Sequence, residues 1–228
     1  MNKPRQLTFP WNKVNKSSLE GFYTSQENFH LVSLLKDSDF LGDLFIYGTK
    51  ESGKTFLLQA MCNFYSSMTK SSLYVPLKKV MNYGVEIFES LENIDLICVD
   101  GIEQVISKIE WEKAIFNLIN KALISESRLI LTSSKDLKSL NFSLPDLESR
   151  IRKIQSYELH AINDKDIFDA LKYISKLTSI NLGDKEAKYL VTYSQRNISN
   201  LVHILESLDQ LSMEKKRKIT IPLIKEVI

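Results

Sequence analysis

The chain has 228 residues, enough for one large domain or for one domain with a small appendage. Hydrophobic residues make up 43% and charged residues 25%, and a formal charge of +2 gives no global attraction to nucleic acid. Two cysteines in apolar runs, Cys62 and Cys98, predict buried thiols in a reducing compartment, and no zinc spacing occurs. With neither a membrane-length apolar run nor a signal peptide, we expect a cytoplasmic protein without a membrane partner.

Residues 1–18 form a polar tail that we expect to be flexible, with one apolar segment, Gln6-Leu7-Thr8-Phe9-Pro10-Trp11. Pro10 restricts Phe9 to extended geometry, so the segment is not a helix. It either folds back and buries its rings in the domain, or presents Leu7, Phe9 and Trp11 to a pocket on a partner. The residues leave these two alternatives open.

Apolar strand patterns and helical patterns alternate over residues 19–160, which predicts a doubly wound α/β domain with a parallel sheet. A capping-box pattern at Thr24 predicts a helix to Leu35, with Phe29, Val32 and Leu35 on one face. We expect strands at residues 43–47, 72–75, 94–99 and 128–132, and helices at 54–68, 76–91 (interrupted near Gly84), around 111–119, and 144–154.

The first strand leads into Gly48-Thr49-Lys50-Glu51-Ser52-Gly53-Lys54-Thr55, followed by a helix, which is the context of a phosphate-binding P-loop. Backbone N–H groups of such a loop and the following helix N-terminus attract phosphate. Lys54 is expected to reach the β- and γ-phosphates, and the Thr55 hydroxyl to ligate Mg²⁺. The sequence therefore predicts an ADP or ATP site, although a loop of this shape with weak nucleotide binding stays open.

Two further strand ends carry polar residues toward the same edge of the sheet. Asp100 ends the apolar run at 96–99 and is expected to hold Mg²⁺, and Glu103 is expected to polarise an attacking water. The strand at 128–132 ends in hydroxyls, and we expect Ser133 to contact the nucleotide. A turn that caps the next segment explains those hydroxyls equally well.

Arg150 lies at the border of the apolar stripe in the helix at 144–154. Its side chain either pairs with Asp146 one turn earlier, worth a few tenths of a kcal/mol, or enters a neighbouring subunit's nucleotide site as an arginine finger. The residues by themselves favour the ion pair.

Strand patterns stop near residue 160. Helical periodicity then predicts four helices, at residues 164–177, 184–194, 198–211 and 222–228. Residues 161–228 are expected to form a small helical lid domain.

The order of these motifs resembles an AAA+ ATPase, and the chain is similar to the DnaA-related AAA+ proteins of the Hda family. The segments that carry this resemblance lie at residues 6–11, 74–77, 97–103, 111–116, 144–150, 208–211 and 218–226, so it spans nearly the whole chain. The segments at 111–116 and at the C-terminus are far more specific than the P-loop, which many families share.

The resemblance implies that Gln6, Leu7, Phe9, Pro10 and Trp11 bind the sliding clamp, the β subunit of the DNA polymerase. It also implies that Arg150 acts in trans on ATP held by the initiator DnaA. DNA would then be contacted mainly through the clamp, and a homo-oligomer stays open.

Two positions depart from the family pattern. Ser199 stands where the family's third lid helix begins with an arginine that senses the nucleotide, and a serine supplies no fixed charge. Arg196 lies three residues earlier, and whether it substitutes is left open. Lys153-Ile154-Gln155 replaces an aromatic-glycine pair after the Arg150 helix, so packing there is expected to differ.

These observations favour a negative regulator of replication initiation that has weak ATPase activity of its own and activates hydrolysis by DnaA. An autonomous ATPase of the helicase-loader type, acting on single-stranded DNA, is the main alternative. A clamp-binding adaptor that uses nucleotide only as a structural ligand is a third.

Overall fold

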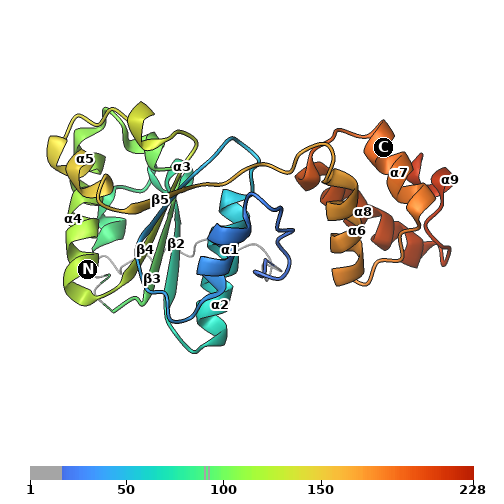
Figure 1. Cartoon of the computed structure of the whole chain (residues 1–228), viewed down its shortest axis with the longest axis horizontal. Helices are drawn as coiled ribbons and strands as arrows, with labels where there is room; N and C mark the ends of the chain where they lie inside the picture. The colour runs from blue at the N-terminus through green and yellow to red at the C-terminus, as the bar shows by residue number, and fades with distance from the viewer. Residues whose placement is uncertain (1–16, 90, 92) are drawn as a thin grey trace, which may run out of the picture.

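A computed structural model describes residues 17–89, 91 and 93–228. Figure 1 shows two packed units joined by an extended segment after β5: a sheet covered by helices on both faces, and a cluster of helices. The apolar segment at residues 6–11 lies outside the described residues. Within the described part, none of the helices combines the length and apolar character that crossing a membrane requires.

The sheet has five parallel strands in the order β2-β3-β4-β1-β5, which confirms the predicted parallel α/β architecture. Leu44 of β1 pairs with Ile130 of β4 on one side and with Gln155 of β5 on the other. The three inner strands, β1, β3 and β4, are mostly apolar and buried from both faces, as expected for a parallel sheet. The strands are β1 (Leu44–Tyr47), β2 (Ser72–Pro76), β3 (Leu96–Asp100), β4 (Arg128–Ser133) and β5 (Gln155–Glu158).

Each face of the sheet is covered by its own helices and its own apolar core. The face that includes Phe45, Ile97 and Leu129 packs against α3 (Leu77–Val80), η1 (Val85–Phe88), η2 (Ile102–Val105), α4 (Ile109–Ser125) and α5 (Pro145–Ile151). The face that includes Ile46 and Cys98 packs against α1 (Phe29–Lys36) and α2 (Lys54–Ser67). Figure 1 shows these two sets of helices on opposite sides of the sheet. The remaining short helix of this unit is η3 (Leu137–Ser139).

The predicted start of the first helix is wrong. α1 begins at Phe29, because the Thr24 hydroxyl donates to the Phe22 carbonyl instead of accepting from a helix N–H. Phe29, expected on the buried face, is 66% exposed, and Leu31 takes its place in the core. Asn28 precedes the helix and binds both backbone groups of His160, which ties the start of α1 to the end of β5.

Two other segments differ from expectation. The helix expected at residues 76–91 is reduced to α3 and the 3₁₀ turn η1, and the interruption predicted near Gly84 is present, with Gly84 at φ +97°. The helix expected to reach residue 154 ends at Ile151, and β5 follows without having been predicted. Both cysteines are free: Cys98 is buried as expected, whereas Cys62 is half-buried.

The second unit is entirely helical within its described residues, 161–228. It consists of α6 (Ile167–Leu177), α7 (Asp184–Tyr193), α8 (Ile198–Glu214) and α9 (Ile221–Ile224) around a separate core that includes Leu171, Leu190 and Leu205. It also contacts the first unit, since the Tyr173 hydroxyl donates to the Glu20 carbonyl at 2.5 Å and the Tyr173 ring packs edge-on against Tyr23.

Candidate functional site

The predicted P-loop connects β1 to α2, and its two glycines are required by its geometry. A Cβ atom at Gly48 would lie 2.2 Å from the backbone oxygen of Leu159, which cannot move without disturbing the end of β5. Gly53 directly precedes α2 at φ +98°, in the left-handed region that favours glycine. The loop is therefore fixed between the sheet and the first turn of α2.

The Lys54 ammonium is held inside the loop. It donates to the carbonyl oxygens of Gly48 and Thr49, each at 2.7 Å, and to the Ser52 hydroxyl at 3.3 Å. Burial lowers the pKa of Lys54, and the carboxylates of Glu103 and Asp100 act in the opposite direction. A cation with two nearby acids is thus positioned at the centre of the loop.

The Asp100 carboxylate, at the end of β3, accepts hydrogen bonds from three hydroxyl groups. Thr55 and Tyr74 donate to Oδ2 at 2.6 and 2.8 Å, and Thr132 donates to Oδ1 at 2.7 Å. Burial, assisted by the negative charge of Asp100, raises the pKa of the Tyr74 phenol, so this group stays a donor. The sequence predicted Thr55 beside Asp100 but missed Tyr74 and Thr132. The only feature of the sequence that could have indicated these two residues is their position near the ends of the strands on either side of β3.

A cavity of about 530 Å³ opens beside these groups. It brings together Lys54, Thr55, Asp100, Glu103 and Ser199, all predicted from the sequence. Its complete lining is Lys50, Glu51, Gly53, Lys54, Thr55, Phe56, Gln59, Pro76, Lys78, Asp100, Gly101, Glu103, Gln104, Ser134 and Ser199. Hard oxygen ligands and a lysine that line the same cavity suit a phosphate with its metal ion.

The strand-end hydroxyl assigned to the nucleotide is not at the cavity. Ser133 is fully buried, and its hydroxyl accepts from the Lys135 N–H at 2.9 Å. Its hydroxyl therefore caps the following turn, which is the alternative role considered from the sequence. Ser134, the next residue, lines the cavity instead. Gly48, Thr49 and Ser52 shape the P-loop without lining the cavity.

Glu103 lies in η2, directly after Gly101, and lines the cavity. Its Oε2 atom is buried and has no hydrogen-bond partner among the described residues. A buried carboxylate oxygen without a donor is costly, and such groups cluster at functional sites. The position is compatible with a general base, which is the role predicted for it.

The helical unit contributes Ser199 to the cavity, from the first turn of α8. The Asn197 side chain caps this helix by accepting from the N–H groups of Ser199 and Asn200. Arg196 forms an ion pair with Asp164 at 3.4 Å and does not line the cavity. Among the described residues, no arginine of the helical unit lines it.

Arg150 lies away from this cavity, on α5. It lines a second hollow of about 390 Å³ with Asp43, Ile119, Leu123, Lys153, Ile154 and Gln155. The ion pair with Asp146, considered from the sequence, is not formed: no ion pair or hydrogen bond joins the Arg150 guanidinium to another described residue. Arg152, the residue directly after α5, does pair with Glu148, at 2.6 Å.

Glu112, which the sequence did not single out, fixes the start of α5. It is fully buried on α4 and accepts from the N–H groups of Ser107, Ser143 and Leu144, at 2.7 to 3.1 Å. Leu144 is the residue that directly precedes α5. This carboxylate therefore sets where the Arg150 helix begins.

Within the described residues, no group of three or more His, Cys, Asp or Glu side chains could hold a metal ion by itself. Thr55 and Asp100 supply two oxygen ligands at the cavity edge, 2.6 Å apart. Any metal there needs ligands from phosphate or water, as Mg²⁺ does in nucleotide sites.

Two protein-family models match the chain. The bacterial DnaA ATPase domain matches residues 31–157, and the Hda lid domain matches residues 164–228. An uncharacterized protein of Haemophilus influenzae is 36% identical over 231 aligned positions, which cover 100% of this chain and 99% of that protein.

The fold is similar to solved structures of replication initiators. Domain III of the Thermotoga maritima replication initiation protein DnaA has a TM-score of 0.74 at 18% identity, covering 93% of this chain and 97% of that one. The AMPPCP-bound DnaA of Aquifex aeolicus has a TM-score of 0.69 at 21% identity, covering 88% and 69%. These likenesses establish an AAA+ fold, with the helical unit in the place of the lid.

Proposed function

The chain belongs to the Hda family of DnaA-related AAA+ proteins, and from this premise we propose that it is a negative regulator of DNA replication initiation. In this proposal the nucleotide-bound protein docks on the DNA-loaded sliding clamp and stimulates ATP hydrolysis by DnaA. The observation that carries the proposal is the Arg150 guanidinium, which is unpaired among the described residues and lies outside the chain's own nucleotide cavity.

We propose ADP or ATP with Mg²⁺ as the ligand of the larger cavity. Lys54 would bind the phosphates, and Thr55 and Asp100 would hold the metal, whose chemistry is to neutralise phosphate charge. The N-terminal turn of α8 with Ser199 would contact the nucleotide from the lid. Because Ser199 carries no charge, the nucleotide serves mainly to fix the lid against the sheet.

Arg150 would act on a neighbour. An arginine that lies outside its own chain's nucleotide cavity cannot stabilise a transition state there, whereas it can enter the site of a partner packed against α5. An arginine finger of this kind raises the hydrolysis rate by about 10³ to 10⁵. The buried Glu112 carboxylate would orient the helix that presents it.

The decisive experiment measures ATP hydrolysis by DnaA with clamp, DNA and this protein, each omitted in turn. Arg150→Ala should lower the stimulated rate by about 10³ or more while leaving clamp binding intact. Arg152→Ala is the matched control, since it removes an arginine from the end of the same helix that is already paired with Glu148. Retained stimulation by Arg150→Ala rejects the finger.

The docking step is tested separately. Residues 6–11 lie outside the described residues, and the proposal assigns Gln6, Leu7, Phe9, Pro10 and Trp11 to the pocket of the clamp. In a pulldown on the clamp, Gln6→Ala and Phe9→Ala should each reduce the bound fraction, and Thr8→Ala should not. Unchanged binding by the first two variants removes the clamp from the proposal.

Glu103 supports the alternative of an autonomous ATPase of the helicase-loader type, because a carboxylate with an unpaired buried oxygen lines the cavity. That alternative predicts single-turnover hydrolysis without DnaA, abolished by Glu103→Gln. If the unmodified protein and Glu103→Gln both bind nucleotide tightly and neither hydrolyses it, the nucleotide serves only as a structural ligand.

A further inference from the structure

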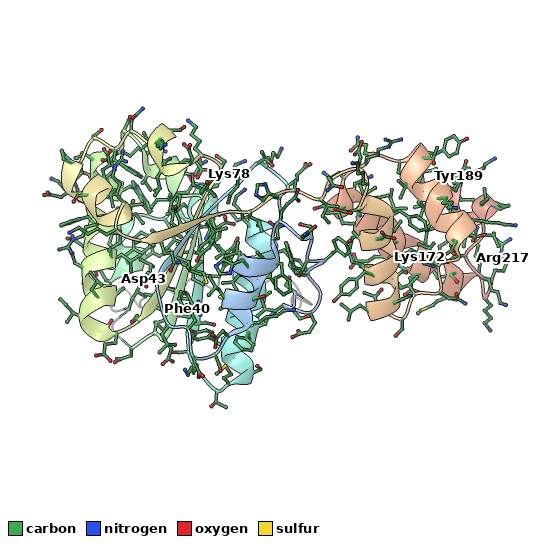
Figure 2. All side chains as sticks on the ribbon, in the orientation of Figure 1. Phe40, Asp43, Lys78, Lys172, Tyr189 and Arg217 are labelled. Atoms are coloured by element: carbon green, nitrogen blue, oxygen red, sulfur yellow. The ribbon has the colours of Figure 1, made fainter. Side chains whose placement is uncertain are left out.

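The solvent-facing side of α7 carries a stacked pair of tyrosines. Tyr189 and Tyr193 are one helical turn apart, with ring centroids 4.4 Å from each other and ring planes inclined by 32°. Tyr189 packs partly on the lid core, whereas Tyr193 is 65% exposed. Figure 2 labels Tyr189 on this helix, in the lid and away from the sheet. One ring thus supports another that presents a broad apolar face to water.

Lysines accompany the rings. Lys185, one turn before Tyr189, and Lys188 are both exposed, and neither forms an ion pair with another described residue. Two acids, Asp184 and Glu186, lie in the first turn of the same helix, and Lys172 on α6 pairs with Asp184 at 2.9 Å. That contact, and then the nearby charges of Lys188 and Lys176, lower the pKa of Asp184. Four lysines, Lys172 and Lys176 on α6 and Lys185 and Lys188 on α7, outnumber these two acids, which leaves net positive charge on this side of the lid.

We propose that this face of α7 binds single-stranded nucleic acid, with an unpaired base stacked on Tyr193 and the backbone phosphates near Lys185 and Lys188. Exposed aromatic rings beside a basic surface are how proteins bind single strands without sequence preference. A nucleic-acid duplex is disfavoured because its base faces are stacked and cannot reach Tyr193. An acidic peptide is disfavoured because it would contact the lysines without using the Tyr193 ring. The proposal requires neither the clamp nor DnaA, and so goes beyond the proposed function.

The rings are tested by fluorescence anisotropy of the full-length protein with a labelled single-stranded oligo(dT) of about 20 nucleotides, longer than one binding site. Tyr193→Ala should weaken binding about tenfold, the effect of losing one stacked base. Tyr193→Phe keeps the ring and should bind like the unmodified chain. Because Tyr193 is exposed, both variants should fold, which thermal unfolding checks.

The lysines are tested by the salt dependence of the same binding. Lys185→Ala combined with Lys188→Ala should reduce the slope of log affinity against log salt by about 1.4, whereas Tyr193→Ala should leave the slope unchanged. Lys216→Ala with Lys218→Ala is the control, because it removes two exposed lysines of the same lid, between α8 and α9.

Any one of several results would overturn the proposal. They are no binding to oligo(dT), equal binding to a duplex of the same length, equal losses in Tyr193→Ala and Tyr193→Phe, and equal losses in the two lysine pairs. If Tyr193→Ala leaves oligo(dT) binding intact but weakens binding to DnaA or the clamp, the face is a protein-docking surface instead. Failure here leaves the Arg150 and clamp experiments unaffected.

Discussion

The carboxylate of Asp100 and the guanidinium of Arg150 belong to the same AAA+ domain but are held in opposite ways. Three hydroxyls from α2, β2 and β4 donate to Asp100, and it lines a cavity beside Lys54. Arg150 makes no hydrogen bond to a described residue, and its position depends on the anchoring of α5 by Glu112. The first group is organised for a ligand held by this chain, and the second is left available for a partner.

The largest effect is expected from a change in the P-loop. If the P-loop can be altered without loss of stability, the contrast between a rigid nucleotide site and an unpaired Arg150 fails. Gly48→Ala puts a Cβ against the backbone of Leu159, so we expect a loss of about 3 kcal/mol in the free energy of unfolding, measured by urea denaturation. Gly183→Ala is the control, since the nearest atom there is the movable end of Glu186. If both variants lose the same free energy of unfolding, the P-loop can adjust to a side chain at residue 48.

Lys54→Ala tests whether the site depends on its cation. Loss of charge-assisted hydrogen bonds to phosphate should weaken ADP binding about 100-fold in titration calorimetry with Mg²⁺. Lys79→Ala, an exposed lysine outside the cavity lining, should bind normally. Unimpaired binding by Lys54→Ala would place the nucleotide elsewhere.

Glu112→Gln tests the region that anchors α5 and so positions Arg150. It leaves one acceptor where a carboxylate served three N–H groups, so the free energy of unfolding should fall by about 2 kcal/mol. Stimulation of DnaA should decline more than ADP affinity does. Glu110→Gln, exposed on the same helix, is the control. If ADP affinity is lost and stimulation kept, the two regions are not separate.

Tyr74→Phe should have the smallest effect, a loss of about 1 kcal/mol for one hydrogen bond to Asp100. Because the pKa of Tyr74 is raised on folding, its contribution is fully present below the unfolded pKa of 10.0 and disappears as pH rises through the folded pKa. The two proteins should therefore converge in stability at strongly alkaline pH. A pH-independent difference between them would contradict this assignment. Tyr193→Phe, at an exposed ring, is the control.

Local sequence determined the elements whose signals lie within a few residues. The apolar runs of β1, β3 and β4 predict buried parallel strands, and the spacing from Gly48 to Thr55 predicts the loop between β1 and α2. β5 escaped prediction because Gln155–Glu158 is polar and largely exposed, and its extended form depends on pairing with β1. A helix start was misplaced at Thr24 because its hydroxyl had a competing partner in Phe22.

By itself, the sequence determined that Lys54, Thr55 and Asp100 would meet, since parallel strands deliver their carboxyl ends to one edge of a sheet. Only the tertiary structure decided which other groups converge there: Tyr74 and Thr132 join Asp100, and Ser134 replaces Ser133. It also decided that Arg150 is not paired with Asp146. Such choices depend on hydrogen-bond competition between residues far apart in the chain, which no local pattern contains.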